Sequence, residues 1–376
     1  MPEPNRSHLD VLCSYHDDYV ALGAEFLGNA GGFSGASFWK VYGKKGTFCL
    51  RRWARNYPTQ ERLQFIHAVQ WHVRMEGFSG FPMPVETLEG TTYVQEDGFF
   101  WQLEPWMEGK ADFRKSPNTN RLVSAMTSLA EFHNATKSFP VLKEKGTSPL
   151  LLEHEKTLLR WTDSRLAELE DRVRLYGVAG SELFQDVTFI SGLSDSDGPA
   201  GTTGWRIGNE VTIPCKMSMK TQSRLQNAAL RILPRVRELR RPVLTQVVRV
   251  GNQSMRLQPC LYDIHLEHLF FERDRFTGFI DFGSLGNDNA SVDIARMLSA
   301  LTGSQAKHWL TGLTAYQSVR PLRPEELLAV QVIRRSTVLS MAIRWIEYIF
   351  TQNNPVKCST HLVRRLERLA DILERL

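Results

Sequence analysis

The most constraining feature of this sequence is the stretch 259–283, which reads PCLYDIHLEHLFFERDRFTGFIDFG. Two short apolar runs, 269–271 and 276–282, flank a turn-like Glu-Arg-Asp-Arg segment, an arrangement typical of a β-hairpin. Asp263 precedes the first predicted strand and Asp281 ends the second. Because a hairpin brings its two ends together, we expect both carboxylates to face one small volume. There they can hold a divalent cation and the phosphates bound to it.

At these residues the chain resembles the aminoglycoside phosphotransferase and choline kinase superfamily, whose members are related to the protein kinases. That superfamily carries a loop reading roughly H-x-D-x-H-x-x-N, then a hairpin and the sequence I-D-F/W-G. Asp263 falls on its catalytic Asp, His265 on its second His and Asp281 on its metal-binding Asp. The segment DNASVDIARML resembles the superfamily's D-P-x-x-D-L-A, with Asp293 on the buried Asp. The order and spacing of these elements make the resemblance specific.

The resemblance implies an α+β, protein-kinase-like fold of two lobes, for which a chain of 376 residues is long enough. Residues 1–107 would form the nucleotide-binding lobe, with a five-stranded antiparallel sheet and one helix. Residues 108–376 would form a larger, mainly helical lobe that carries the catalytic loop and hairpin. The segment 190–214 is rich in Gly, Ser and Asp, which predicts a flexible insertion in this lobe.

The resemblance also implies ATP-dependent phosphoryl transfer to a hydroxyl group of a small molecule. ATP and Mg²⁺, or Mn²⁺, would be the cofactors. Asp263 would accept the proton of the attacking hydroxyl, and Asp281 would hold the metal ion between the phosphates.

Two departures from the superfamily pattern affect this reading. Leu261 takes the place of the loop's first His, and His268 takes that of the Asn that holds a second metal ion. Imidazole suits softer cations than an amide oxygen does, so His268 is a candidate ligand with a shifted metal preference. The other reading of His268 is a ring packed under the hairpin with one nitrogen hydrogen-bonded to the backbone. The departures also leave open a catalytically inactive kinase-fold protein that binds a nucleotide, a metabolite or a protein partner.

The candidate nucleotide-binding residues lie in the first 107 positions. A Gly-rich segment between two predicted strands contains Gly31, Gly32 and Gly35, and glycine lets backbone N–H groups approach phosphate closely. Its spacing matches no standard phosphate-binding motif, so a plain hairpin turn is the other reading. Arg51 takes the place of the Lys that binds phosphate in the kinase arrangement, with Arg52 as the alternative.

Two further features of the N-terminal part concern the nucleotide. The helix predicted over 60–76 should carry a Glu that pairs with the phosphate-binding cation, but the nearest acid, Glu61, lies about one turn early. The segment 104–109 resembles the hinge between kinase lobes, where backbone groups near Glu104 would meet an adenine edge. Trp106 would stack on the base or, alternatively, close the lobe interface.

Apolar spacing predicts helices over 10–27, 149–176 and 221–240, the last with a boundary at Arg241–Pro242. The net charge of +5 comes from dispersed basic residues, so no nucleic-acid partner is expected. No run of about 20 apolar residues is present to span a bilayer, and the N-terminus lacks a signal-peptide pattern. The five cysteines show no disulfide or zinc spacing. A cytoplasmic protein without membrane contact is expected.

Overall fold

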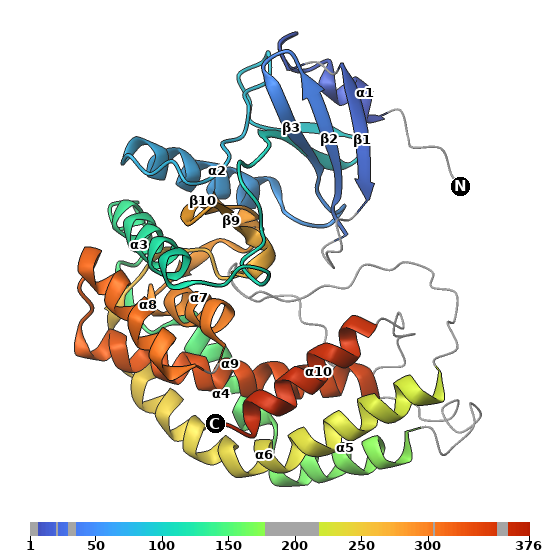
Figure 1. Ribbon diagram of the computed structural model, residues 1–376, viewed down its shortest axis with the longest axis vertical. Coiled ribbons are helices and arrows are strands. Elements are labelled where there is room, and N and C mark those ends of the chain that lie inside the picture. Colours follow the sequence, from blue (N-terminus) through green and yellow to red (C-terminus); the bar gives the residue numbers. More distant parts are fainter. Residues whose placement is uncertain (1–6, 20–21, 29–34, 177–217, 304, 352–359) are drawn as a thin grey trace.

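The computed structural model describes residues 7–19, 22–28, 35–176, 218–303, 305–351 and 360–376. The N-terminal sheet has five strands that pair antiparallel in the order β1-β2-β3-β5-β4 (Figure 1). They are β1 (Gly23–Gly28), β2 (Ser37–Gly43), β3 (Gly46–Arg52), β4 (Val94–Glu96) and β5 (Phe99–Pro105). The predicted five-stranded sheet and the two-lobed α+β fold are confirmed. The insertion predicted near 190–214 lies outside the described residues.

Two helices belong to this part of the chain, α1 (Ser7–Leu12) and α2 (Gln60–Met75). The Oγ of Thr59 accepts a hydrogen bond from the backbone N–H of Arg62 at 3.2 Å, which caps the start of α2 as its sequence predicts. The helix predicted over 10–27 is wrong beyond Leu12, where α1 ends, and its last residues, from Gly23 on, lie in β1. There β1 pairs with β2, so tertiary hydrogen bonding overrides the helical spacing of the apolar residues.

The remaining helices form the larger part of the molecule (Figure 1). They are α3 (Thr119–Thr136), α4 (Pro149–Arg160), α5 (Asp163–Leu175), α6 (Met219–Gly251), α7 (Ser291–Thr302), α8 (Ala306–Val319), α9 (Pro324–Phe350) and α10 (Thr360–Leu373). The predicted boundary at Arg241–Pro242 is wrong, because α6 continues through Pro234 and Pro242. Both prolines are exposed, and the helix packs along α4, α5, α9 and α10, which holds it together. Among the described helices, none is both long and apolar enough to cross a membrane.

Short strands carry the predicted catalytic region. They are β6 (Lys145–Gly146), β7 (Met255–Arg256), β8 (Gln258–Cys260), β9 (Leu269–Glu272), β10 (Arg275–Phe279) and β11 (Gly286–Asp288). β9 and β10 form the predicted antiparallel hairpin, with a register shift between Phe276 and Gly278. Gly278 touches the loop before β4 closely, since a Cβ there would lie 2.3 Å from the carbonyl oxygen of Gly80. The hairpin thereby joins the two parts of the molecule.

Two hydrophobic clusters make up the core. The smaller one lies in the N-terminal sheet and includes Leu50, Trp101 and Leu103. The larger one spans the helical part and also takes in Ile66 and other residues of α2. Aromatic rings continue it across the junction between the parts, since Phe282 packs on Phe81 at 5.1 Å and on Phe132 at 6.1 Å between ring centroids. The helix of the small part is therefore anchored to the large core.

Candidate active site

The loop that follows β8 is held by hydrogen bonds to a buried acid. Asp293, near the start of α7, accepts the backbone N–H of Leu261 at 2.6 Å and that of Tyr262 at 2.8 Å. Its other contact is the Nε2 of His133 on α3, at 3.1 Å. Because both N–H groups are immediately before Asp263, Asp293 fixes the backbone from which the Asp263 carboxylate projects. Asp293 is fully buried, as the sequence comparison with the superfamily implied.

Asp263 is partly buried and pairs with a neighbour in the same loop. Its Oδ1 lies 2.8 Å from the Nε2 of His265. Burial acts to raise the pKa of Asp263, but the hydrogen bond and charge of His265, followed by the charges of His268 and Arg296, outweigh it and hold the pKa below its ordinary value. Asp263 is therefore a carboxylate at neutral pH, the form that can accept a proton.

Asp281 ends the hairpin in a left-handed backbone conformation, with φ of +64°. Its Oδ1 accepts hydrogen bonds from the Nη1 of Arg51 at 2.9 Å and from the backbone N–H of Gly283 at 3.3 Å. Burial acts to raise the pKa of Asp281, but the charges of Arg51 and His268 outweigh it and lower the pKa to about 2. The carboxylate is ionised and its Oδ2 takes no part in these two bonds.

His268 lies between the two acids. Its Nδ1 is 3.0 Å from the backbone carbonyl oxygen of Asp263, and its Nε2 is 4.0 Å from the Oδ2 of Asp281. A carbonyl oxygen only accepts hydrogen bonds, so Nδ1 carries a hydrogen. The charged ring turns Nε2–H toward Asp281, and the neutral ring leaves the Nε2 lone pair free to bind a cation there. One imidazole thus contacts the backbone of Asp263 and faces the carboxylate of Asp281, in an arrangement that suits a cation held by Nε2 and Oδ2.

Arg51 of β3 reaches the same place from the sheet. Its guanidinium carbon lies 3.5 Å from the ring centroid of Trp53, and the side chain is 6% exposed. Its Nε is buried and has no hydrogen-bond partner among the described residues. A buried N–H group without a hydrogen-bond acceptor lowers the stability of the protein unless a ligand supplies the acceptor. The donor beside Asp281 therefore suits an anionic oxygen such as that of a phosphate.

The acid that balances Arg51 does not come from α2. That helix presents Ile66 and Gln70 to the cavity around Arg51, whereas Glu61 is exposed. Asp281 supplies the ion pair instead, and Glu104 of β5 also lies in the cavity. The sequence left open which acid pairs with Arg51, and in the structure that acid is Asp281.

Glu104 lines the cavity through its carboxylate, although the sequence reading assigned this position to the backbone of a hinge. Its Oε2 accepts the Nε2–H of Gln102 at 2.8 Å. Burial raises the pKa of Glu104 to about 7, against the opposing charge of Arg51. Around these groups the cavity is small, about 10 Å³, and is lined by Arg51, Trp53, Ile66, Gln70, Pro82, Gln102, Glu104, Asp281 and Phe282.

Of the other predicted nucleotide contacts, the two that the structure describes, Gly35 and Trp106, are not among the residues that line this cavity. Gly31 and Gly32 are outside the described residues. Gly35 is exposed, with φ of +74°, a conformation that favours glycine. Trp106 is partly exposed, with the Nζ of Lys40 at 4.8 Å from its ring centroid, and its backbone N–H already donates to the carbonyl of Thr47 at 2.9 Å. The roles predicted for these residues remain predictions.

Sequence reasoning missed the contacts that attach α2 to the Asp281 turn. Arg62 donates to the carbonyl oxygen of Gly283 at 3.2 Å and also to that of Leu285, and Tyr57 donates to the carbonyl of Gly283 at 2.6 Å. The residues are over 220 positions apart in the chain, so no local pattern could reveal them.

A second group of possible metal ligands, His133, Cys260 and Asp293, has its ligand atoms within 4.8 Å of one another. These atoms are already used in hydrogen bonds, since Asp293 binds the loop and the thiol of Cys260 donates to the carbonyl of Asp288. Burial raises the pKa of Cys260 well above its ordinary value, so the thiol stays protonated. This group is a structural hydrogen-bond network.

The fold is protein-kinase-like, and Asp281 of the hairpin pairs with Arg51 of the sheet between the small sheet and the helical part. A profile of the phosphotransferase enzyme family matches residues 25–184 and 211–326. The chain belongs to this family.

Solved structures give the same fold. A spectinomycin phosphotransferase, in complex with ADP and spectinomycin, has a TM-score of 0.62 with 10% identity, and the match covers 100% of both chains. An amicoumacin kinase in complex with AMP-PNP, Ca²⁺ and Ami has a TM-score of 0.54 with 10% identity, covering 96% of this chain and 90% of that one. A choline/ethanolamine kinase family protein from Mesorhizobium loti has a TM-score of 0.50 with 15% identity, covering 95% and 90%. A search of curated proteins finds no match.

Proposed function

We propose that this protein is a small-molecule kinase that transfers the γ-phosphoryl group of ATP to a hydroxyl group. The observation that carries the proposal is the place of His268, whose ring is hydrogen-bonded to the backbone of Asp263 and faces Asp281, with Arg51 ion-paired to Asp281. The family and the structural neighbours are phosphotransferases, and two neighbours bind adenine nucleotides. We further propose that residues 1–107 form the nucleotide-binding lobe and residues 108–376 the lobe that binds the acceptor.

In this proposal the carboxylate of Asp263 accepts the proton of the acceptor hydroxyl as its oxygen attacks the γ-phosphorus. The bond between that phosphorus and the β–γ bridging oxygen breaks, and ADP leaves. His265 orients Asp263 and its charge keeps the carboxylate ionised. Asp293 holds the backbone of the loop during the reaction. The protein's contribution is then positioning and charge, which is the larger part of catalysis in phosphoryl transfer.

The donor atoms present fit a divalent cation. The Oδ2 of Asp281 and the Nε2 of His268 would hold it, with waters and phosphate oxygens completing its shell. A divalent cation bound there would neutralise charge on the β- and γ-phosphates. The mixed oxygen and nitrogen set favours Mn²⁺ more than an all-oxygen set would, although Mg²⁺ remains usable. Arg51 would supply a second positive charge through its unpaired Nε–H.

The ion pair between Arg51 and Asp281 favours a second candidate function, a kinase-fold protein without transfer activity. With that pair in place the cavity measures only about 10 Å³, and Asp281 is engaged by a guanidinium instead of a cation. Such a protein would bind a nucleotide, a metabolite or a protein partner without turnover.

One experiment separates the two functions. ATP consumption is measured with Mg²⁺ or Mn²⁺ against a panel of amino alcohols, aminoglycosides and hydroxy amino acids, and ATP affinity is measured by calorimetry on the same samples. A kinase shows acceptor-dependent turnover that Asp263→Asn reduces by about 10³-fold or more while ATP affinity persists. Tight ATP binding without turnover on any acceptor supports the second candidate. Absence of nucleotide binding in the wild-type protein would refute the kinase and would restrict the second candidate to a metabolite or a protein partner.

A further inference from the structure

A second cavity, of about 220 Å³, lies outside the candidate active site. It is formed where the end of α3, the strand β7 and the connection between α8 and α9 meet. Its lining residues are Asn134, Lys137, Met255, Arg256, Val319, Arg320, Pro321, Arg323, Glu325 and Glu326. Its volume is below the roughly 300 Å³ at which sites for drug-sized ligands begin, so it suits a compact ligand and not a nucleotide.

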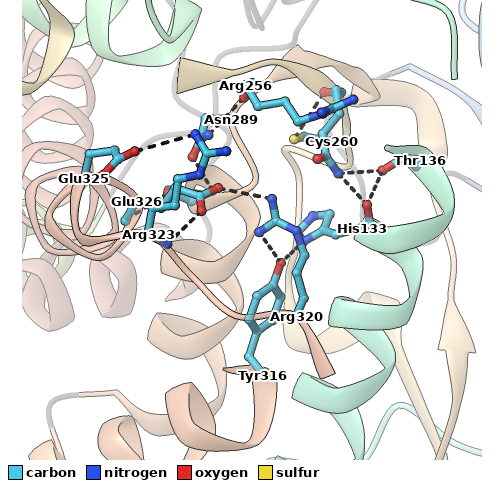
Figure 2. A network of polar contacts seen from close by, with 12 residues as sticks. His133, Thr136, Arg256, Cys260, Asn289, Tyr316, Arg320, Arg323, Glu325 and Glu326 are labelled. Carbon is cyan, nitrogen blue, oxygen red and sulfur yellow. Dashed lines mark hydrogen bonds and ion pairs between the residues drawn. The ribbon is translucent and has the colours of Figure 1, made fainter. Parts of the chain in front are cut away.

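The charges of the lining favour an anion. The lining contains four cationic side chains and two acids. One of the acids, Glu326, already accepts hydrogen bonds from within the protein. Glu326 accepts the Nη2–H of Arg320 at 3.1 Å through Oε1 and the backbone N–H of Arg323 at 3.1 Å through Oε2 (Figure 2). Glu325 is a distant partner, 3.9 Å from the Nη1 of Arg323. The helix α9 also begins here at Pro324, so its positive end adds to the potential.

Free donors remain on the cationic side. Arg256 uses its Nη2 to donate to the carbonyl oxygen of Lys137 at 3.2 Å. Its Nε is buried and has no hydrogen-bond partner among the described residues. The side chain of Lys137 is exposed at the mouth of the cavity. A phosphate or carboxylate group between Arg256 and Lys137 would accept a hydrogen bond from the buried Nε–H of Arg256, which has no partner among the described residues.

A continuous series of hydrogen bonds leads from this cavity to the catalytic loop. The Nη1 of Arg320 donates to the Oη of Tyr316 at 3.1 Å, and that hydroxyl lies 2.8 Å from the Nδ1 of His133 (Figure 2). The Nε2 of His133 lies 3.1 Å from Asp293, which binds the loop before Asp263. Burial, chiefly, lowers the pKa of His133, so the ring is neutral.

The direction of each bond in this series is fixed by chemistry. A carboxylate only accepts, so the Nε2 of His133 carries the ring hydrogen and donates to Asp293. Nδ1 must then accept, which makes Tyr316 the donor and leaves its oxygen to accept from Arg320. A change at Arg320 therefore alters an acceptor bond of Tyr316, and aligned bonds of this kind strengthen one another.

We propose that this cavity is a second ligand site for a compact anion carrying a phosphate or a carboxylate group, and that its occupancy stabilises the catalytic loop. Arg256 and Lys137 bind the anion. The anion also competes with Glu326 for the Nη2–H of Arg320, and the resulting shift of the guanidinium is transmitted through Tyr316 and His133 to Asp293. The site is distinct from the place where Arg51 meets Asp281, so the inference does not depend on transfer activity.

The test uses the full-length protein without nucleotide and two probes, inorganic phosphate and succinate, which separate the two anion chemistries. Affinity is measured by calorimetry, and hydrogen exchange is followed at the amides of Leu261 and Tyr262. We expect one or both probes to slow exchange at these amides about fivefold or more. Arg256→Gln and Lys137→Gln should each weaken the binding about tenfold, since each removes a charged hydrogen-bond donor. The second variant alters only an exposed side chain, so folding does not confound it.

Two control variants decide where the probe binds. Arg335→Gln removes the same charge from α9 outside the cavity and should leave the affinity unchanged. Arg51→Gln, which removes the cation of the candidate active site, should also leave it unchanged. Loss of binding in Arg51→Gln but not in Arg256→Gln and Lys137→Gln would overturn the proposal, as would the absence of binding by both probes. Binding at the cavity with unchanged exchange at Leu261 and Tyr262 would overturn the coupling to the loop.

Discussion

At the scale of single residues, His268 is the side chain on which the chemistry of the proposed cation site depends. The sequence places it where the superfamily has an Asn, and the structure shows what the exchange does. The carbonyl oxygen of Asp263 holds Nδ1, so Nε2 is aimed at the Oδ2 of Asp281. The other reading of His268, a ring packed under the hairpin with one nitrogen hydrogen-bonded to the backbone, also agrees with the contact of Nδ1. The metal preference of nucleotide binding separates the two readings.

We therefore expect His268→Asn to change the metal preference of nucleotide binding. An amide oxygen is a harder ligand than imidazole, so Mg²⁺-supported ATP binding should improve relative to Mn²⁺-supported binding by about tenfold. Calorimetry with each cation gives the ratio directly. His265→Asn, which changes the same residue type without facing Asp281, is the control. An unaltered Mg²⁺/Mn²⁺ ratio in His268→Asn would show that the ring does not touch the ion.

At the scale of elements, α6 differs most clearly from what its local sequence predicts, because it continues past a proline. Proline lacks a backbone N–H and its ring crowds the preceding turn, so Arg241–Pro242 predicts an end to the helix. The structure continues α6 to Gly251, because buried residues on one face, such as Val236, Val243 and Val247, pack against the neighbouring helices. The tertiary contacts thus offset the cost of an interior proline.

Replacing the interior proline of α6 should therefore stabilise the protein. Pro242 is exposed, so Pro242→Ala removes no core contact and restores an N–H donor for the carbonyl of Glu238. The free energy of unfolding should rise by about 1–3 kcal/mol, measured by urea denaturation. Pro324→Ala is the matched control, since Pro324 stands in the first turn of α9, where proline is favourable. Equal effects of the two substitutions would contradict this account of α6.

At the scale of the whole molecule, the Asp281 turn joins the sheet to the helical part. Arg51 reaches it from β3, Arg62 reaches it from α2, and Phe282 packs between Phe81 and Phe132. Glu104 lies in the same junction with a pKa raised to about 7, mainly by burial, whereas that of Asp281 is lowered to about 2. The two carboxyl groups therefore make stability depend on pH in separate ranges.

Whether each group makes stability rise or fall with pH depends on whether the folded or the unfolded state binds its proton more tightly. Between pH 4.5 and 7 the folded protein holds a proton on Glu104 that the unfolded chain releases, so stability falls as the pH rises through this range. For Asp281 the stabilising contribution is present above pH 3.8 and is lost as the pH falls toward 2.

Glu104→Gln should abolish the first of these dependences. The amide cannot ionise, so the variant should lose less stability than the wild-type protein between pH 5 and 7.5. Urea denaturation at the two pH values, on both proteins, measures this difference. Glu61→Gln serves as a control, because Glu61 is exposed on α2 and its pKa is lowered by local hydrogen bonds, so it does not titrate in that range. A parallel decline in wild-type and Glu104→Gln proteins would assign the dependence to other groups.

The sequence by itself determined the β9–β10 hairpin, the order of Asp263 and Asp281 around it, and the strands β2 to β5 of the N-terminal sheet, because turn chemistry and alternation act over a few residues. It could not supply the acid that pairs with Arg51, since Asp281 lies 230 positions away and the expected Glu of α2 is missing. Only the tertiary structure decided that pairing, the course of α6 through Pro242, and the cavity beside Arg320. Each depends on side chains that meet through packing of distant elements, and such contacts leave no periodic mark in the chain.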